Sequence, residues 1–312
     1  MGQRDAGRSG RALVATGTVV MAILGLLMMT GPVAARQFSS WAVPQLVNQT
    51  NDTDSVNTTN FEGCAMQSPD GLSLYFASKR PRVDANDVVH TDRDIYVAHR
   101  ASTSDPWGTA ENLGAPINTA ADEFCPTPVR GGGLFFVSKR AGGGDIYFTR
   151  LNPDHGWSDP VNLGPNVNDP VLTEAGPSYF EADGNAYLYF SSGGAANTSD
   201  IFVSQQLPDG SFGPRTAVAE LNSASDDFRP NVRKDGLEVV FDSNRPGGAG
   251  GLDIRTATRA STSDPWSTPT NLTVVNTAGN EARASFSWDG STLYFGRSPG
   301  AVGSSDIYVA TR

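Results

Sequence analysis

The sequence predicts an all-β fold made of five copies of one unit, and three observations lead to this prediction. An Asp-Ile dipeptide, usually completed by an aromatic residue, recurs every 51 to 55 residues, beginning at Asp94, Asp145, Asp200, Asp253 and Asp306. The octapeptide RASTSDPW occupies residues 100–107 and again 259–266, three repeat lengths later. Each copy contains a glycine turn, mostly Asp-Gly, between apolar stretches, which is a hairpin signal. Self-similarity at a fixed period indicates a repeat architecture.

Within each copy the elements follow in a fixed order. An acidic residue opens the first short strand of each copy, at Glu62, Glu123, Glu174, Asp227 and Glu281. After the turn comes an aromatic β run such as LSLYFAS or AYLYFSS, and then the Asp-Ile strand. The fourth strand is led by an aromatic residue, namely Trp107, Trp157, Phe212 or Trp266. We expect these four rings to pack between neighbouring units rather than to stack on a ligand.

The two ends of the chain predict how the units close. There are five copies of the first three strands but four aromatic-led strands, because the sequence stops at Arg312, directly after the fifth Asp-Ile strand. The missing strand is expected at residues 41–44, WAVP. One N-terminal strand would complete the last unit and remove an exposed sheet edge. The prediction is therefore a five-bladed β-propeller of four-stranded antiparallel blades over residues 36–312, in one domain.

The segments SPDGLSLYFASKR and RDIYVAHR, which carry this pattern, resemble the TolB-type propeller repeat, a relative of the WD repeat. The resemblance covers nearly the whole chain after residue 35. It implies a periplasmic interaction module, a domain fused to a peptidase, or a part of an envelope complex. We expect here neither the fused peptidase domain nor the extra N-terminal domain of TolB itself.

The first 35 residues have the features of a secretory signal peptide. Arg4, Arg8 and Arg11 form a basic segment, an apolar run covers residues 13–29, and VAA at residues 33–35 offers a cleavage site. The alternative is an uncleaved membrane anchor. No later segment is apolar enough to span a bilayer. We therefore expect a periplasmic or secreted monomer.

Charge and motifs exclude several classes of function. The formal net charge of −10 repels nucleic acid and anionic membranes, so neither is an expected partner. His90, His99 and His155 lack metal-ligand spacing, and the sequence contains no nucleophile elbow and no EF-hand loop. We expect no metal and no cofactor. In an oxidising compartment Cys64 and Cys125 can form a disulfide, if neighbouring strands approach closely enough, or remain two thiols.

The fivefold pattern breaks two residues after each acid, at Cys64, Cys125, Gly176, Arg229 and Arg283. Because strand side chains alternate, we expect these residues to face the central channel together with the acids. Arg229 and Arg283 could then clamp a carboxylate or a phosphate. The alternative is that they neutralise Asp227 and Glu281. Two long segments, 48–57 and 81–93, should project from the same face and could also bind a ligand.

Other repeated residues are expected to be structural. Arg80, Arg140 and Arg245 follow the aromatic run at one offset, and Arg140 is predicted to pair with Asp145. Blades three and five have no arginine at that offset. An asparagine precedes each acid, at Asn57, Asn118, Asn168, Asn222 and Asn276, where its amide can hold a turn. The acids should accept backbone N–H bonds in the same loop, and a cation-binding carboxylate ring is the alternative.

These observations favour a binding or interaction module that takes an envelope protein, a glycan or an anionic small molecule at its channel face. The candidate ligand-binding residues are Arg229, Arg283, Glu62, Glu123, Glu174, Asp227 and Glu281. No catalytic motif is present. The alternative is a carbohydrate-active hydrolase or lyase that uses the inner-strand carboxylates, which would need an open pocket with two acids facing it.

Overall fold

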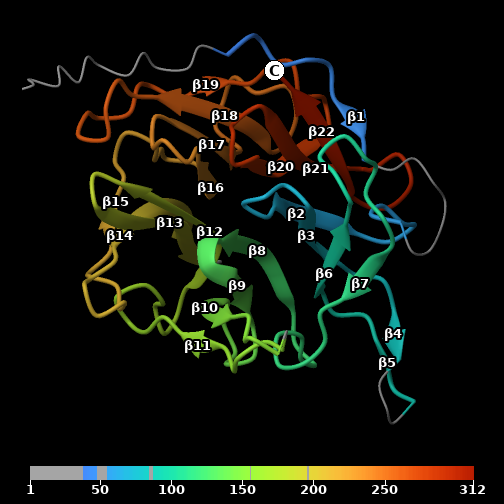
Figure 1. Ribbon diagram of the computed structural model, residues 1–312. Helices are drawn as coiled ribbons and strands as arrows, with labels where there is room; N and C mark the ends of the chain where they lie inside the picture. Colours follow the sequence, from blue (N-terminus) through green and yellow to red (C-terminus); the bar gives the residue numbers. More distant parts are fainter. Residues whose placement is uncertain (1–37, 48–54, 84–86, 155, 195–196) are drawn as a thin grey trace, which may run out of the picture. The chain divides into compact units, whose positions relative to one another are not determined.

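The fold is described by a computed structural model over residues 38–47, 55–83, 87–154, 156–194 and 197–312. Residues Phe38–Arg312 form one compact unit. Its strands make five four-stranded antiparallel sheets in a ring (Figure 1), which confirms the predicted five-bladed propeller. Within the described ranges there is no α-helix, one 3₁₀ turn at Arg130–Gly132, and no helix long and apolar enough to cross a membrane. The expected leader lies outside these residues.

Each blade begins with its innermost strand, and these five strands surround the centre of the ring in Figure 1. They are β2 (Glu62–Gln67), β8 (Glu123–Val129), β12 (Thr173–Ala182), β16 (Asp227–Val232) and β20 (Asn280–Phe286). The second strands are β3 (Ser73–Ser78), β9 (Gly133–Ser138), β13 (Asn185–Gly194), β17 (Glu238–Ser243) and β21 (Thr292–Ser298). The third strands are β6 (Asp94–His99), β10 (Asp145–Arg150), β14 (Asn197–Gln205), β18 (Asp253–Thr258) and β22 (Asp306–Thr311). The outermost strands are β7 (Ala110–Asn112), β11 (Val161–Asn162), β15 (Thr216–Ala217), β19 (Thr270–Asn271) and β1 (Gln45–Leu46).

Strand β1 closes the ring, slightly later in the chain than residues 41–44. Gln45 and Leu46 pair with β22, so blade five contains an N-terminal strand beside the last strand of the chain (Figure 1). Pro44 has no N–H to donate to the ladder, which explains why regular pairing begins after it. Trp41 is buried and stacks on Phe286, with ring centroids 6.2 Å apart.

The apolar core lies between the blades. Each second strand contributes one fully buried phenylalanine, at Phe76, Phe136, Phe190, Phe241 and Phe295. Burial of such a side chain stabilises the fold by about 1.5–3 kcal/mol. Of the aromatic residues that lead the fourth strands, Trp107, Phe212 and Trp266 are buried and Trp157 packs partly buried against the core. Their expected packing role is confirmed.

The repeated asparagines hold the connections between blades. Asn118 accepts a hydrogen bond from the Ile95 N–H and donates one to the Ile95 carbonyl, both at 2.9 Å. Asn57 does the same with Ile307, across the ring closure. The other three repeat the arrangement. The partner is therefore the third strand of the blade that the chain is leaving, rather than a residue of the same turn.

The two octapeptides have one structural role. In the first copy Arg100 donates from Nε to the Gly71 carbonyl at 2.8 Å and lies 4.1 Å from the ring centroid of Trp107. Arg259 makes both contacts in the second copy, at 2.6 and 4.2 Å. Each copy therefore fastens the hairpin turn of its own blade to a tryptophan.

A hairpin in the first blade extends away from the ring (Figure 1). It consists of β4 (Arg82–Val83) and β5 (Val89–His90), which pair antiparallel within the long 81–93 segment. Residues 84–86 of this segment, and residues 48–54 of the other long segment, lie outside the described ranges. The ligand-binding role expected for these two segments stays a prediction.

Candidate binding site at the channel face

The channel face is the face of the ring at which the five innermost strands begin. The acid that opens each strand is fully buried there, with no exposed surface. Its carboxylate accepts a hydrogen bond from a backbone N–H four or five residues earlier, at 2.7 to 3.2 Å. The placement of Glu62, Glu123, Glu174, Asp227 and Glu281 supports the structural role and offers a ligand no exposed carboxylate atom.

An arginine contacts each of these acids. The five are Arg80, Arg140, Arg215, Arg245 and Arg297. The expected Arg140–Asp145 pair is wrong, because Arg140 turns to Glu123 at 3.7 Å. Blades three and five obtain their arginine from other positions: Arg215 precedes the outermost strand, and Arg297 lies directly opposite its acid on β21. Every blade therefore has an arginine beside its buried acid, but the arginine does not always occupy the same position in the repeat.

Burial changes the acidity of one of these groups strongly. Loss of solvation raises the pKa of Glu174 to about 7, although hydrogen bonds from Ser192 and the Asp169 N–H and the charge of Arg215 act in the opposite direction. Desolvation also raises the pKa of Glu62 and Glu123.

A β-bulge follows each acid and corrects the expected alternation of side chains. In blade one the pairing of β2 with β3 shifts between Gly63 and Met66, and the other blades shift at the same place. The first bulge residue has positive φ in every blade: 53° at Cys64, 49° at Cys125, 60° at Gly176, 46° at Arg229 and 62° at Arg283. The extra residue in the bulge reverses the alternation beyond it. The acids therefore lie beneath the face, while the bulge residues line the channel.

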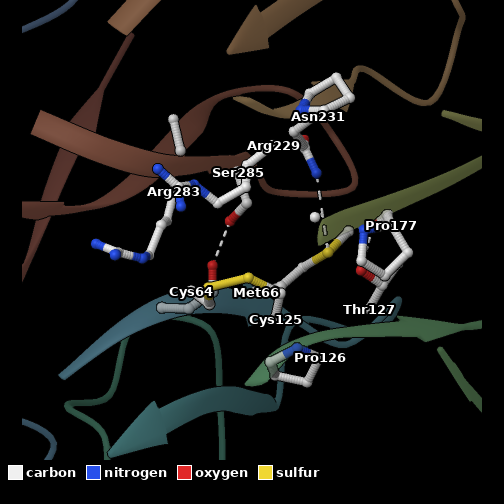
Figure 2. Close-up of a pocket in the computed structure, with 14 residues that line it drawn as sticks. Cys64, Met66, Cys125, Pro126, Thr127, Pro177, Arg229, Asn231, Arg283 and Ser285 are labelled. Atoms are coloured by element: carbon white, nitrogen blue, oxygen red, sulfur yellow. Dashed lines mark hydrogen bonds between the residues drawn. A yellow bond between two sulfur atoms is a disulfide. The ribbon is translucent and has the colours of Figure 1, made fainter. Parts of the chain in front are cut away.

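The channel itself is almost filled. The bulges surround a cavity of about 30 Å³, room for little more than one or two water molecules (Figure 2). Cys64 and Cys125 form a disulfide between blades one and two, with Cα atoms 4.7 Å apart. Ser285 and Thr127 donate to backbone carbonyls of neighbouring innermost strands. At the level of the bulges the described residues therefore pack closely.

Arg229 and Arg283 lie at the mouth of this channel in different environments. Arg229 binds the buried Asp242, with Nε 2.9 Å from Oδ2. Arg283 donates its backbone N–H to the same carboxylate at 3.0 Å. Among the described residues its guanidinium has no hydrogen-bond partner, and it lies 5.1 Å from the ring centroid of Phe61. Desolvation lowers the pKa of Arg283 to about 9, with further lowering by the charges of Arg229 and Arg93.

A second group of cations lies on the same face. Arg93 and Lys139 share one carboxylate, Asp122, at 3.1 and 3.2 Å. Desolvation opposes ionisation of Asp122, but hydrogen bonds from Arg93 and Lys139 and the charge of Arg93 lower its pKa to about 2. Asp242 pairs with the guanidinium of Arg229 but bonds only the backbone N–H of Arg283, so among the described residues no carboxylate pairs with the Arg283 guanidinium. The mouth is thus locally positive on an acidic protein.

The expected alternative for the two arginines is therefore wrong. Asp227 is bound by Arg245, and Glu281 by Arg297 at 2.8 Å, so neither acid depends on the bulge arginines. The partner that sequence reasoning missed is Asp242. Its signal was present, because the aromatic run of blade four reads VVFDS where the first three blades have Ala, Val or Ser before the serine.

A cleft of about 730 Å³ lies beside the channel mouth, over blade three. Phe124 and Phe228 line it from blades two and four, together with Arg93, Lys139 and Arg229. Small residues of blade three line the rest: Thr173, Ala175, Ser191, Gly193, Gly194, Thr198 and Ser199. Among the described residues, Asp226 is the one carboxylate in the lining. Sequence reasoning identified the gap at Gly176 but not the two phenylalanines beside it.

Two glycines allow the chain to pack closely around this cleft. A Cβ on Gly176 would lie 2.5 Å from the Cα of Arg229, and one on Gly193 would lie 2.5 Å from the Cα of Ser199. Real Cβ atoms do not approach backbone atoms so closely, so any side chain at either position would force the strands apart.

No protein-family model and no curated protein sequence matches the chain. Solved structures match it by fold. An endo-arabinase from Bacteroides thetaiotaomicron VPI-5482 has a TM-score of 0.55 at 16% identity, over 88% of this chain and 98% of that protein. A thermostable family-43 glycoside hydrolase has 0.53 at 13% identity, over 86% and 91%. A protein assigned as TolB from Agrobacterium tumefaciens has 0.46 at 18% identity, over 76% and 70%. At these identities the similarity of the two hydrolases concerns the fold alone.

Proposed function

We propose that the chain is an exported, non-catalytic binding module that takes an anionic ligand at its channel face. The observation that carries the proposal is the unequal charge at the channel mouth. Arg229 pairs with Asp242, Arg93 and Lys139 share the carboxylate of Asp122, and among the described residues the Arg283 guanidinium pairs with no carboxylate. An arriving carboxylate or phosphate would supply the missing negative charge and hydrogen-bond acceptors.

The hydrolase alternative has less support from the side chains, although hydrolases share the fold. Glycoside hydrolysis by the usual route needs two carboxyl groups on either side of the bond that breaks. The five inner-strand acids are buried and bound to arginines, and among the described residues Asp226 alone offers a carboxylate to the cleft. The same described residues contain no group of three or more His, Cys, Asp and Glu placed to hold a metal.

The proposal includes the TolB-type repeat and export to the periplasm or the exterior. The repeat segment SPDGLSLYFASKR and the leader-like residues 1–35 support these points, and the disulfide fits an oxidising compartment. Mass spectrometry of the mature protein tests export, since its N-terminus should lie near residue 36. A protein partner that presents an acidic side chain is the competing occupant of the site.

Titration calorimetry tests the function. Galacturonate and sulfate serve as anionic probes, and R283A is compared with R130A, which removes an exposed arginine at the other end of β8. We expect R283A to weaken anion binding about 10- to 100-fold, corresponding to about 1.5–3 kcal/mol for a charged hydrogen bond, and R130A to leave it unchanged. Turnover of a glycan panel, or equal affinity in both variants, would contradict the proposal.

A further inference from the structure

The cleft over blade three is suited to a ligand that is more than a simple anion. It continues from Arg229 at the channel mouth to the end of β13 and the start of β14, and its volume of about 730 Å³ lies in the range of small-molecule sites. A small anion bound at Arg283 alone would not need a cleft of this volume. The shape and chemistry of the cleft therefore carry information about the rest of the ligand.

The cleft exists because blade three lacks the bulky residues of its neighbours. Directly after the acid, blades two and four carry Phe124 and Phe228, whereas blade three carries Ala175. The next position is Gly176, where a side chain would collide with Arg229. A floor of small residues thus lies between two aromatic walls.

The lining combines two kinds of surface. Phe228 is half-buried and lies 4.8 Å from the guanidinium of its neighbour Arg229. Thr173 and Thr198 are exposed, whereas Ser191 and Ser199 are buried, and the Ser191 hydroxyl already bonds the Ala175 carbonyl and the Arg229 N–H. An aromatic face beside two exposed threonine hydroxyl groups matches a sugar ring, which has an apolar C–H face and a hydroxyl rim. An aryl or alkyl anion would cover the hydroxyls without bonding them, which costs free energy.

The charge of Asp226 favours one orientation of an anionic ligand in the cleft. Its carboxylate accepts hydrogen bonds from the Ser199 N–H at 3.1 Å and from the Asn244 amide at 2.9 Å. A carboxylate has about four acceptor sites, so it can also accept from a ligand hydroxyl. It repels an anionic group, which is drawn instead toward Arg229 and Arg283. A ligand in this cleft should be charged at one end and hydroxyl-rich at the other.

We infer that the ligand is an acidic saccharide, with its carboxylate or phosphate at Arg229 and Arg283 and its neighbouring sugar ring against Phe228 over the floor of blade three. The inference rests on the proposed function and goes beyond it, because it names the chemical class. It assigns affinity to two separate parts, an anion site and a ring site. Those parts can be removed one at a time.

The test is a calorimetric titration of the parent, R283A and F228A. Phe148→Ala is the matched control, because Phe148 is also half-buried but packs on Phe135 away from the cleft. The probes are trigalacturonate, its neutral methyl ester, galacturonate, glucose 6-phosphate, 2-naphthoate and sulfate. We expect trigalacturonate to bind at least 10-fold more tightly than sulfate, its ester or 2-naphthoate. F228A should remove most of this advantage and leave sulfate binding within about 2-fold, whereas F148A should change neither.

The outcomes separate the inference from the function. If sulfate binding depends on Arg283 but trigalacturonate binds no more tightly than sulfate, the saccharide assignment is wrong and the anion site stands. The same conclusion follows if F228A does not change the affinity for trigalacturonate. If 2-naphthoate binds best, the occupant is an aryl anion and the assignment is also wrong. Tighter binding of glucose 6-phosphate than of galacturonate supports the class and makes the anion a phosphate. If no probe depends on Arg283, both proposals fail.

Discussion

Arg229 and Arg283 occupy equivalent positions in adjacent blades, yet their removal should affect stability to very different extents. R229A leaves the carboxylate of Asp242 buried, with 0% of its side chain exposed, and without its guanidinium. Breaking a buried pair in this way costs about 3–5 kcal/mol. The 16% exposure of the Arg229 side chain lets some water reach the gap, and Asp242 keeps its bond from the Arg283 N–H. We therefore expect a loss near the lower limit, about 3 kcal/mol.

R283A removes a guanidinium that bonds no carboxylate among the described residues. It loses the stacking on Phe61, worth about 0.5–1 kcal/mol, and relieves repulsion from Arg229 and Arg93. Alanine keeps the same positive φ as arginine, so backbone strain does not differ between parent and variants. The net change should stay within about 1 kcal/mol of the parent.

The assay is urea denaturation of the two variants and of the R229A/D242A double variant, at pH 7. Removal of Asp242 together with Arg229 eliminates the orphaned charge, so the double variant should be more stable than R229A alone. Anion affinity, measured in parallel, should fall in R283A despite its near-parental stability. If R283A destabilises the fold as much as R229A does, Arg283 has a structural counter-ion, and the interpretation of the mouth as an uncompensated anion site is refuted.

Three further predictions follow from the skeleton of the ring. The pKa of Glu174 is about 7 in the folded protein and about 4.5 in the unfolded chain, so its contribution to the free energy of unfolding is present below pH 4.5 and is lost as pH rises through 7. Between pH 5 and 8 the melting temperature of E174Q should therefore fall less steeply than that of the parent. Parallel curves for the two proteins would exclude the raised pKa. Deletion of residues 38–47 removes β1 and buried Trp41, so calorimetry should show a lower melting temperature by more than 10 °C, or aggregation. Alkylation of the unreduced, unfolded protein should label neither Cys64 nor Cys125, and two labelled thiols would exclude the disulfide. A C64A/C125A variant should lose up to about 4 kcal/mol of unfolding free energy, because the disulfide restricts the entropy of the unfolded chain.

The fold was predictable because the repeat supplies five versions of each signal. Hairpin turns, aromatic strands and the acid that opens each blade recur with enough fidelity to identify every strand set. The unequal count of strands at the two ends predicted the closure. The position of β1 was predicted a few residues too early, because the N-terminal segment with Pro44 occurs once and no other copy of the repeat shows where its strand begins.

The site was less predictable because its geometry depends on the bulge. Alternation of side chains holds only in an uninterrupted strand. A cysteine or an arginine in a sequence does not indicate a left-handed backbone, so Cys64 and Arg229 gave no sign of the bulge. The one direct indication was Gly176, an isolated glycine inside a strand pattern. Pairing across the sheet was equally hidden: Asp242 lies opposite Phe228, thirteen residues after the arginine that it binds.

The bulge also indicates which side chains contribute enough to offset backbone strain. Four non-glycine residues occupy the left-handed region at one repeated position, and each such residue costs of order 1 kcal/mol or more. Glycine would relieve that strain, and blade three shows that the bulge forms with glycine. The other side chains must therefore offset the cost. Cys64 and Cys125 do so by the disulfide, and Arg229 does so by its pair with Asp242. Arg283 has no comparable partner among the described residues, which is the physical reason to look for its partner in a ligand.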